Sequence, residues 1–171
     1  MPVESTKTVP TGTFPPEFAD SLGVFVKLMR AAKAITTRLE HHLACDNLTL
    51  TQLGVLEALL HKGPLSQRDL GRKVLTSAGN MTDLIDKLEA RGLVRRTRTP
   101  LDRRSVRVEL TQSGQTLIEE LFPRHAAEIA ASMNALNREE LRNLSALLRK
   151  LGLTAAGEEA APALVDAIPP P

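Results

Sequence analysis

Residues 91–110 read RGLVRRTRTPLDRRSVRVEL, and this stretch decides the fold. Two short strands are predicted in it, over residues 93–99 and 105–110. In the second, apolar and polar residues alternate from Val106 to Leu110, as in a half-buried strand. Residues 100–102 (Pro-Leu-Asp) supply the turn chemistry between the strands. The stretch therefore predicts a β-hairpin.

This hairpin is strongly basic, whereas the rest of the chain is not. The 171 residues include 22 Lys and Arg and 20 Asp and Glu, a net charge of +2. Seven of the basic residues and two of the acidic ones lie in the hairpin, which leaves a net charge of −3 elsewhere. Such local basicity indicates a docking surface for a phosphate-rich partner. The seven are Arg91, Arg95, Arg96, Arg98, Arg103, Arg104 and Arg107.

Three predicted helices lie directly before the hairpin, within residues 49–90, and each has a start signal. Thr49 and Gln52 form a capping box, and the helix that they begin ends at Gly63-Pro64. Ser66 is the N-cap of a shorter helix. Thr76 or Ser77 caps a third helix, which runs to about residue 90 and has an apolar stripe at Met81, Leu84, Ile85 and Leu88.

Consecutive helices followed by a basic hairpin predict a winged helix-turn-helix, in a fold that is mainly α with a small β-hairpin wing. The helix expected over 18–43 is long enough to pack against a partner chain. Further helices follow Thr111 and Asn137, and Gly152 is expected to end the last one. We expect a disordered arm (1–14), a dimerisation helix (15–46), the winged helix-turn-helix (47–110), C-terminal dimerisation helices (111–152) and a disordered Ala/Pro-rich tail (153–171).

Composition excludes several classes of protein. A single cysteine cannot form an intramolecular disulfide framework, and no signal-peptide pattern or membrane-spanning stretch is present, so a cytoplasmic protein is expected. The absence of Trp and Tyr argues against single-strand binding by aromatic stacking. No glycine-rich phosphate loop, HExxH, nucleophile elbow or CxxC occurs, so we expect no enzyme activity, no catalytic residues and no cofactor.

In a helix-turn-helix, the second helix enters the major groove with its N-terminal residues against base edges. Asn80 can pair with adenine there, although a solvated role is equally consistent, and Thr82 can contact a thymine methyl group. Arg103 and Arg104 suit a narrow minor groove, with Asp102 holding an arginine in place. The predicted DNA contacts are Ser66, Gln67, Arg68, Thr76, Ser77, Asn80, Thr82, Lys87, Arg98, Asp102, Arg103 and Arg104.

The stretch RGLVRRTRTPLDRRSVRVELTQSG resembles the wing of the MarR (multiple antibiotic resistance regulator) family, and LTSAGNMTDLIDKLEARGLV resembles its recognition helix. The resemblance covers roughly residues 18–151. It implies a homodimer whose first and last two helices form the interface, reading a pseudo-palindromic double-stranded operator. It also implies that Arg104 enters the minor groove, oriented by Asp102.

One residue departs from the family pattern. Asp83 stands where many relatives carry a basic residue on the recognition helix. Its carboxylate can accept a hydrogen bond from cytosine N4 or pair with Lys87 one turn further on. We favour the pair with Lys87, so the operator sequence does not follow from the relatives.

The resemblance also implies an effector, which in the family is an aromatic acid, an oxidant or zinc. Its expected cleft lies between the dimerisation helices and the winged region, with Arg30, His41, His42 and Cys45 as candidate contacts. The segments AGNMTDLIDKLE and LFPRHA resemble a branch that responds to quinones and phenolics, which favours a small aromatic effector of a repressor.

Three alternatives remain. A redox switch at Cys45 would need a depressed thiol pKa, and the family's peroxide sensors place their cysteine near the start of the first helix, paired with tyrosines that this chain lacks. A zinc site is disfavoured because the paired histidine spacing of the family's zinc sensors is missing. The chain is also compatible with a non-sensing architectural DNA-binding protein.

Overall fold

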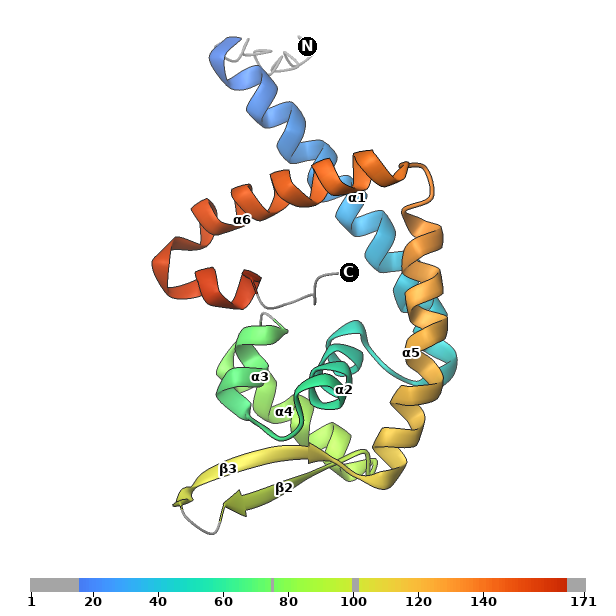
Figure 1. The fold of residues 1–171 in the computed structure, drawn as a ribbon, viewed down its shortest axis with the longest axis vertical. Helices are drawn as coiled ribbons and strands as arrows, with labels where there is room; N and C mark the ends of the chain where they lie inside the picture. The colour runs from blue at the N-terminus through green and yellow to red at the C-terminus, as the bar shows by residue number, and fades with distance from the viewer. Residues whose placement is uncertain (1–15, 75, 100–101, 166–171) are drawn as a thin grey trace, which may run out of the picture.

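Short helices and a small antiparallel sheet form a winged lobe, and long helices extend from it (Figure 1). The computed structural model describes residues 16–74, 76–99 and 102–165. The predicted fold class is confirmed. The elements are α1 (Pro16–Leu43), the 3₁₀ turn η1 (Ala44–Asp46), α2 (Leu50–Lys62), β1 (Leu65–Ser66), α3 (Gln67–Lys73), α4 (Ala78–Ala90), β2 (Val94–Thr99), β3 (Asp102–Leu110), α5 (Gln112–Ser132) and α6 (Arg138–Val165).

Side-chain caps begin the helices where the sequence predicts them. The Thr49 hydroxyl accepts from the Gln52 N–H at 3.2 Å, and the Gln52 side chain accepts from the Thr49 N–H at 3.0 Å. Ser66 caps α3, and Thr111 caps α5. Of the two candidates for α4, the cap is Ser77. Each cap satisfies a backbone donor that the first turn leaves free, so these starts are fixed locally.

The sheet contains one strand that the sequence does not reveal. Its order is β1-β3-β2, with β1 pairing antiparallel at Leu65↔Val108 and Ser66↔Arg107. Asp102, predicted in the turn, is instead the first residue of β3 and pairs with Thr99 beyond a register shift in β2. The expected turn was therefore too long, while residues 100–101 lie outside the described chain.

Apolar side chains from α2, α3, α4, the sheet and α5 meet in one core inside the winged lobe. Burying each large aliphatic side chain contributes roughly 1.5–3 kcal/mol, so this cluster holds the recognition elements on one scaffold. Its fully buried members include Leu53, Leu56, Leu70, Met81, Ile85, Leu88, Val94, Val108, Ile118 and Leu121.

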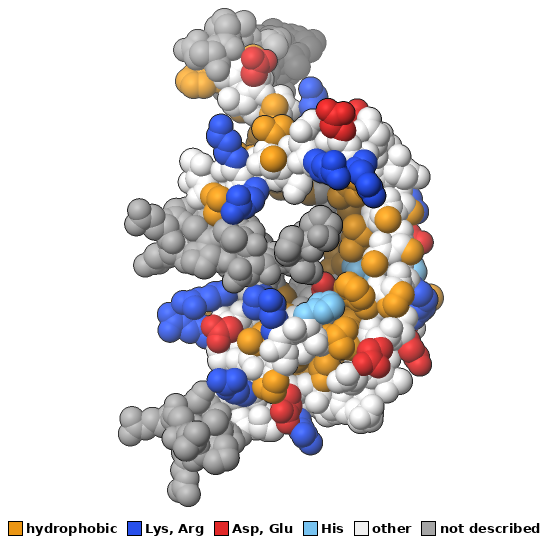
Figure 2. Space-filling model, in the orientation of Figure 1, with side chains coloured by type: hydrophobic (Ala, Val, Ile, Leu, Met, Phe, Trp, Pro, Cys, Tyr) orange, Lys and Arg blue, Asp and Glu red, His pale blue; other side chains and the backbone are white. Residues whose placement is uncertain are grey.

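Helix α5 connects the winged lobe to the rest of the molecule, with α1 packed along it and α6 leaving its far end (Figure 1). Figure 2 shows hydrophobic side chains along the inner, concave side of this arrangement. None of the helices described within residues 16–165 is long and apolar enough to cross a membrane. Large apolar residues of α1 and α6 are exposed: Phe18, Leu22, Val24, Phe25, Val26 and Met29, and Leu141, Leu147, Leu148 and Leu151.

Helix α6 runs past the stop expected at Gly152 and ends at Val165, so that predicted boundary was wrong. The segment after Gly152 is rich in Ala, Leu and Glu, which are good helix formers, and one glycine costs only about 1 kcal/mol in a helix interior. The ribbon changes direction towards its C-terminal end (Figure 1). The predicted N-terminal arm, residues 1–14, lies outside the described chain.

Candidate nucleic-acid interface

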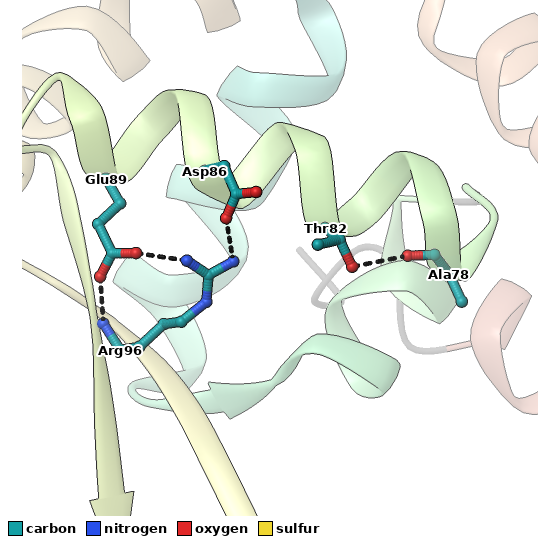
Figure 3. Close-up of polar contacts among 5 residues, drawn as sticks. All are labelled: Ala78, Thr82, Asp86, Glu89 and Arg96. Atoms are coloured by element: carbon teal, nitrogen blue, oxygen red, sulfur yellow. Dashed lines mark hydrogen bonds and ion pairs between the residues drawn. The ribbon is translucent and has the colours of Figure 1, made fainter.

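Helix α4 carries the candidate base contacts on the side away from its buried stripe. Met81, Ile85 and Leu88 are buried, whereas Asn80 and Thr82 are exposed. The Thr82 hydroxyl donates to the Ala78 carbonyl at 3.2 Å (Figure 3), which leaves its methyl group and its acceptor capacity for a base. Ser77, at the start of α4, uses its hydroxyl as the helix cap.

A groove of about 330 Å³ runs between α4 and the start of α2. Thr49 and Thr51 line the groove at the start of α2, and Thr76 lines it from the loop between α3 and α4. Asn80, Asp83, Leu84 and Lys87 line the groove on α4. The structure therefore brings three predicted DNA contacts together around this groove: Thr76, Asn80 and Lys87.

The expected pair of Asp83 with Lys87 is wrong. Both side chains are exposed and line the groove, but the ion pairs within 4.0 Å in the described chain do not include one between them. An exposed surface pair gains little against the side-chain entropy it loses, so helical spacing alone does not bring the two charges together.

The candidate phosphate contacts of α3 differ in their orientation. Arg68 is exposed. The Ser66 hydroxyl caps the helix and also donates to Asp69 Oδ2 at 2.6 Å. The Gln67 amide nitrogen is buried with no hydrogen-bond partner. Of these three, Arg68 is therefore the side chain best placed for a phosphate.

At the base of the hairpin, the arginines are engaged within the protein. Arg91 donates to the backbone carbonyls of Asn47 and Asp46 at 2.6 and 3.1 Å. Arg95 forms an ion pair with Glu109 at 2.6 Å, and Arg107 donates to the Pro64 carbonyl at 3.4 Å. The Arg91 contact ties the end of α4 to the loop between α1 and α2. Sequence reasoning counted these arginines as charge and missed their structural contacts.

Arg96 has the most extensive contacts of this group. Its guanidinium bridges Asp86 and Glu89 on α4, and its backbone N–H donates to Glu89 as well (Figure 3). Burial acts to lower the pKa of Arg96, but the hydrogen bonds and charges of Asp86 and Glu89 together outweigh it and raise the pKa. Arg96 is therefore a fixed cation between the helix and the wing.

The tip of the hairpin carries the remaining predicted wing contacts. Arg98 belongs to β2, and residues 102–104 begin β3, so the backbone places all four in the wing. The side chains of Arg98, Asp102, Arg103 and Arg104 lie outside the described part of the structure. Their assignment to DNA remains a prediction.

The four candidate effector contacts do not form one site within the chain. Arg30 is exposed and lies twelve residues before His42 on α1. This spacing separates the two residues by about 18 Å along the helix. His41 and Cys45 are exposed. His42 is half-buried, and its Nε2 has no hydrogen-bond partner.

His42 lies near a residue absent from our effector candidates, His125 of α5. His125 is only 5% exposed and its Nδ1 has no partner. Burial lowers the pKa of His125, and the charge of His42 lowers it further. Asp46 of η1 pairs with Arg124 through Oδ1 at 3.3 Å, while its buried Oδ2 has no partner. Only the tertiary packing of α1 and η1 against α5 reveals these two contacts. In the part of the chain that the structure describes, no group of three or more His, Cys, Asp or Glu is arranged to hold a metal ion.

Comparison with known proteins gives consistent matches. A model of the MarR family matches residues 48–106. The transcriptional regulator MhqR of Bacillus subtilis is 36% identical over 135 residues, covering 79% of this chain and 93% of MhqR. The transcriptional repressor NicR of Pseudomonas putida is 37% identical over 127 residues, 72% of this chain and 79% of NicR. The structure of Bordetella bronchiseptica BpsR, whose DNA binding is regulated by 6-hydroxynicotinic acid, matches with a TM-score of 0.69 and 31% identity over 77% of this chain and 99% of that one.

Proposed function

The chain belongs to the MarR family of winged helix-turn-helix, DNA-binding transcriptional regulators, and from this premise we propose that it is a homodimeric repressor of a pseudo-palindromic operator. The observation that carries the proposal is the pairing of two reading elements on one scaffold. Helix α4 exposes Asn80 and Thr82, and the hairpin extends beside it with three arginines near its tip. The similar protein NicR is named as a transcriptional repressor, which supports repression rather than activation as the action of this chain.

DNA binding is tested on the promoter of the gene that encodes the protein. We expect a mobility shift that weakens steeply with salt, because Lys and Arg contacts to phosphates release counterions. Arg104→Ala is expected to lose about 1–3 kcal/mol of operator binding, as the loss of a groove-reading arginine does. Equal affinity for random DNA would contradict the proposal, and unchanged affinity of the variant would remove the minor-groove role of Arg104.

We propose further that a small aromatic acid or phenol releases the operator by binding near the junction of α1, η1 and α5. The buried His42 Nε2, Asp46 Oδ2 and His125 Nδ1 lack partners in the described chain. The imidazole nitrogens of the two histidines are suited to hydrogen bonds with a carboxylate or hydroxyl group, and Asp46 Oδ2 can accept a hydrogen bond from a hydroxyl group. The regulation of BpsR by 6-hydroxynicotinic acid supports this class of effector.

The effector proposal is tested with 6-hydroxynicotinic acid and a panel of phenols in operator-release assays. Release is expected in the wild type and in Cys45→Ser, and loss of release is expected in His42→Leu. Release by an oxidant alone that disappears in Cys45→Ser would replace the proposal with a thiol switch at this exposed cysteine. Silence towards the panel and the oxidant would favour a non-sensing DNA-binding protein.

A further inference from the structure

We propose that Arg96, Asp86 and Glu89 form a clamp that sets the angle of the wing relative to the recognition helix, and that they act in operator binding as positioning residues. The inference rests on the proposed operator binding and deepens it. These three side chains join β2 to the last two turns of α4, which are the two elements expected to enter neighbouring grooves.

The clamp contains more hydrogen bonds than an ordinary surface ion pair. The planar guanidinium of Arg96 donates from Nη2 to Asp86 Oδ1 at 2.5 Å and from Nη1 to Glu89 Oε2. Glu89 Oε1 also accepts from the backbone N–H of Arg96 at 3.0 Å. One carboxylate therefore holds both the backbone and the side chain of the same strand residue. Such a forked arrangement fixes orientation as well as distance.

The position of the clamp along the wing explains why it matters. The third strand supports β3 only at Arg107 and Val108, and the hairpin beyond them is two-stranded. From Arg96 to the end of β2 the strand extends about 10 Å, so a tilt of about 10° at Arg96 moves the tip by roughly 2 Å. Since the minor groove is only about 6 Å wide, a shift of this size displaces the tip arginines.

The charge of the cluster favours a positioning role over a direct contact. One guanidinium and two carboxylates give a net charge of −1 beside a surface expected to face DNA. This charge opposes phosphate binding, so long-range electrostatics alone would favour its removal. Figure 3 shows the two carboxylates directed at the guanidinium of Arg96. The guanidinium therefore donates its hydrogen bonds to groups of the protein itself and not to a phosphate.

The decisive variant is Glu89→Gln, because the two explanations predict opposite signs. If Glu89 only repels DNA, the variant binds the operator more tightly. If it positions the wing, we expect affinity to fall about tenfold, since the amide makes weaker, uncharged contacts with Arg96. Arg96→Lys keeps the charge but cannot bridge both carboxylates in the same way, and we expect a similar loss.

Glu109→Gln is the matched control. It makes the same chemical change and also breaks an ion pair with an arginine of β2, but Glu109 and Arg95 both belong to the hairpin. This variant should change operator affinity by no more than about twofold.

Footprints of the operator complexes separate positioning from general damage, with hydroxyl radicals reporting the minor groove and dimethyl sulfate reporting guanine N7 in the major groove. In Glu89→Gln and Arg96→Lys we expect protection at the outer minor grooves to weaken, while protection of the major groove remains. Thermal denaturation of the free proteins should show intact folding. Operator affinity at or above that of the wild type in both variants, or uniform loss of protection in both grooves, would overturn the clamp. Failure of the wild type to bind any operator would instead reject the proposed function.

Discussion

Replacing Phe25 and Leu147 together by glutamate is expected to convert the proposed dimer into a monomer and to weaken operator binding by about a hundredfold or more. Phe25 is 59% exposed and Leu147 is 65% exposed, and neither belongs to the core of the winged lobe. Charges there should therefore leave that lobe folded. They would place unpaired carboxylates in an apolar contact between subunits, which is strongly unfavourable.

The reason lies in the apolar faces that α1 and α6 leave uncovered. Phe18, Leu22, Phe25 and Met29 recur at helical spacing on α1 and are all exposed, as is a leucine row on α6. Exposed apolar patches of this kind mark interaction sites. A dimer joins two winged lobes, so the second half-site is bound at high effective concentration, and a monomer loses this gain.

Analytical ultracentrifugation and mobility shifts measure the two effects together. Arg149→Glu is the control, because Arg149 is exposed two residues from Leu147 and lies on the opposite side of α6. It should remain dimeric. A doubly substituted protein that still sediments as a dimer, or a monomer that retains full operator affinity, would show that these helices do not form the interface.

Much of the winged lobe could be predicted from the sequence because its signals are local. Thr49, Ser66, Ser77 and Thr111 each satisfy backbone groups within three residues, so a cap can be read without knowledge of the fold. The stripe beginning at Met81 and the alternation ending at Leu110 predict burial for the same reason. Strand β1 escaped prediction because two residues carry no periodicity.

The contacts that organise the site depend on tertiary packing instead. In the sequence, Arg96 is indistinguishable from the other basic residues of the hairpin. Only the fold places Asp86 and Glu89 opposite it. His125 joins His42 only because α5 packs on α1. The seven arginines therefore divide into a base group, largely used to hold the lobe together, and a tip group that remains the candidate for DNA. The spacing of the seven arginines along the chain does not distinguish the base group from the tip group.

Gly114→Ala is expected to destabilise the winged lobe by about 3 kcal/mol, because the added methyl group would overlap backbone atoms that cannot move aside. Gly114 lies in the first turn of α5. A Cβ built there would be 1.9 Å from the Leu93 carbonyl oxygen and 2.8 Å from the carbonyl carbon. That same carbonyl accepts the Thr111 N–H at 3.1 Å and so joins the start of β2 to the start of α5.

Relief of the overlap requires α5 to move away from Leu93, which breaks this hydrogen bond and opens the core around Ile118 and Leu121. For a chain of this size, thermal denaturation should show a Tm lower by roughly 6–12 °C. Gly79→Ala on α4 is the control, because its Cβ meets nothing within 4 Å and alanine is the better helix former. A Tm for Gly114→Ala equal to that of Gly79→Ala would mean that α5 is not seated against Leu93 as described.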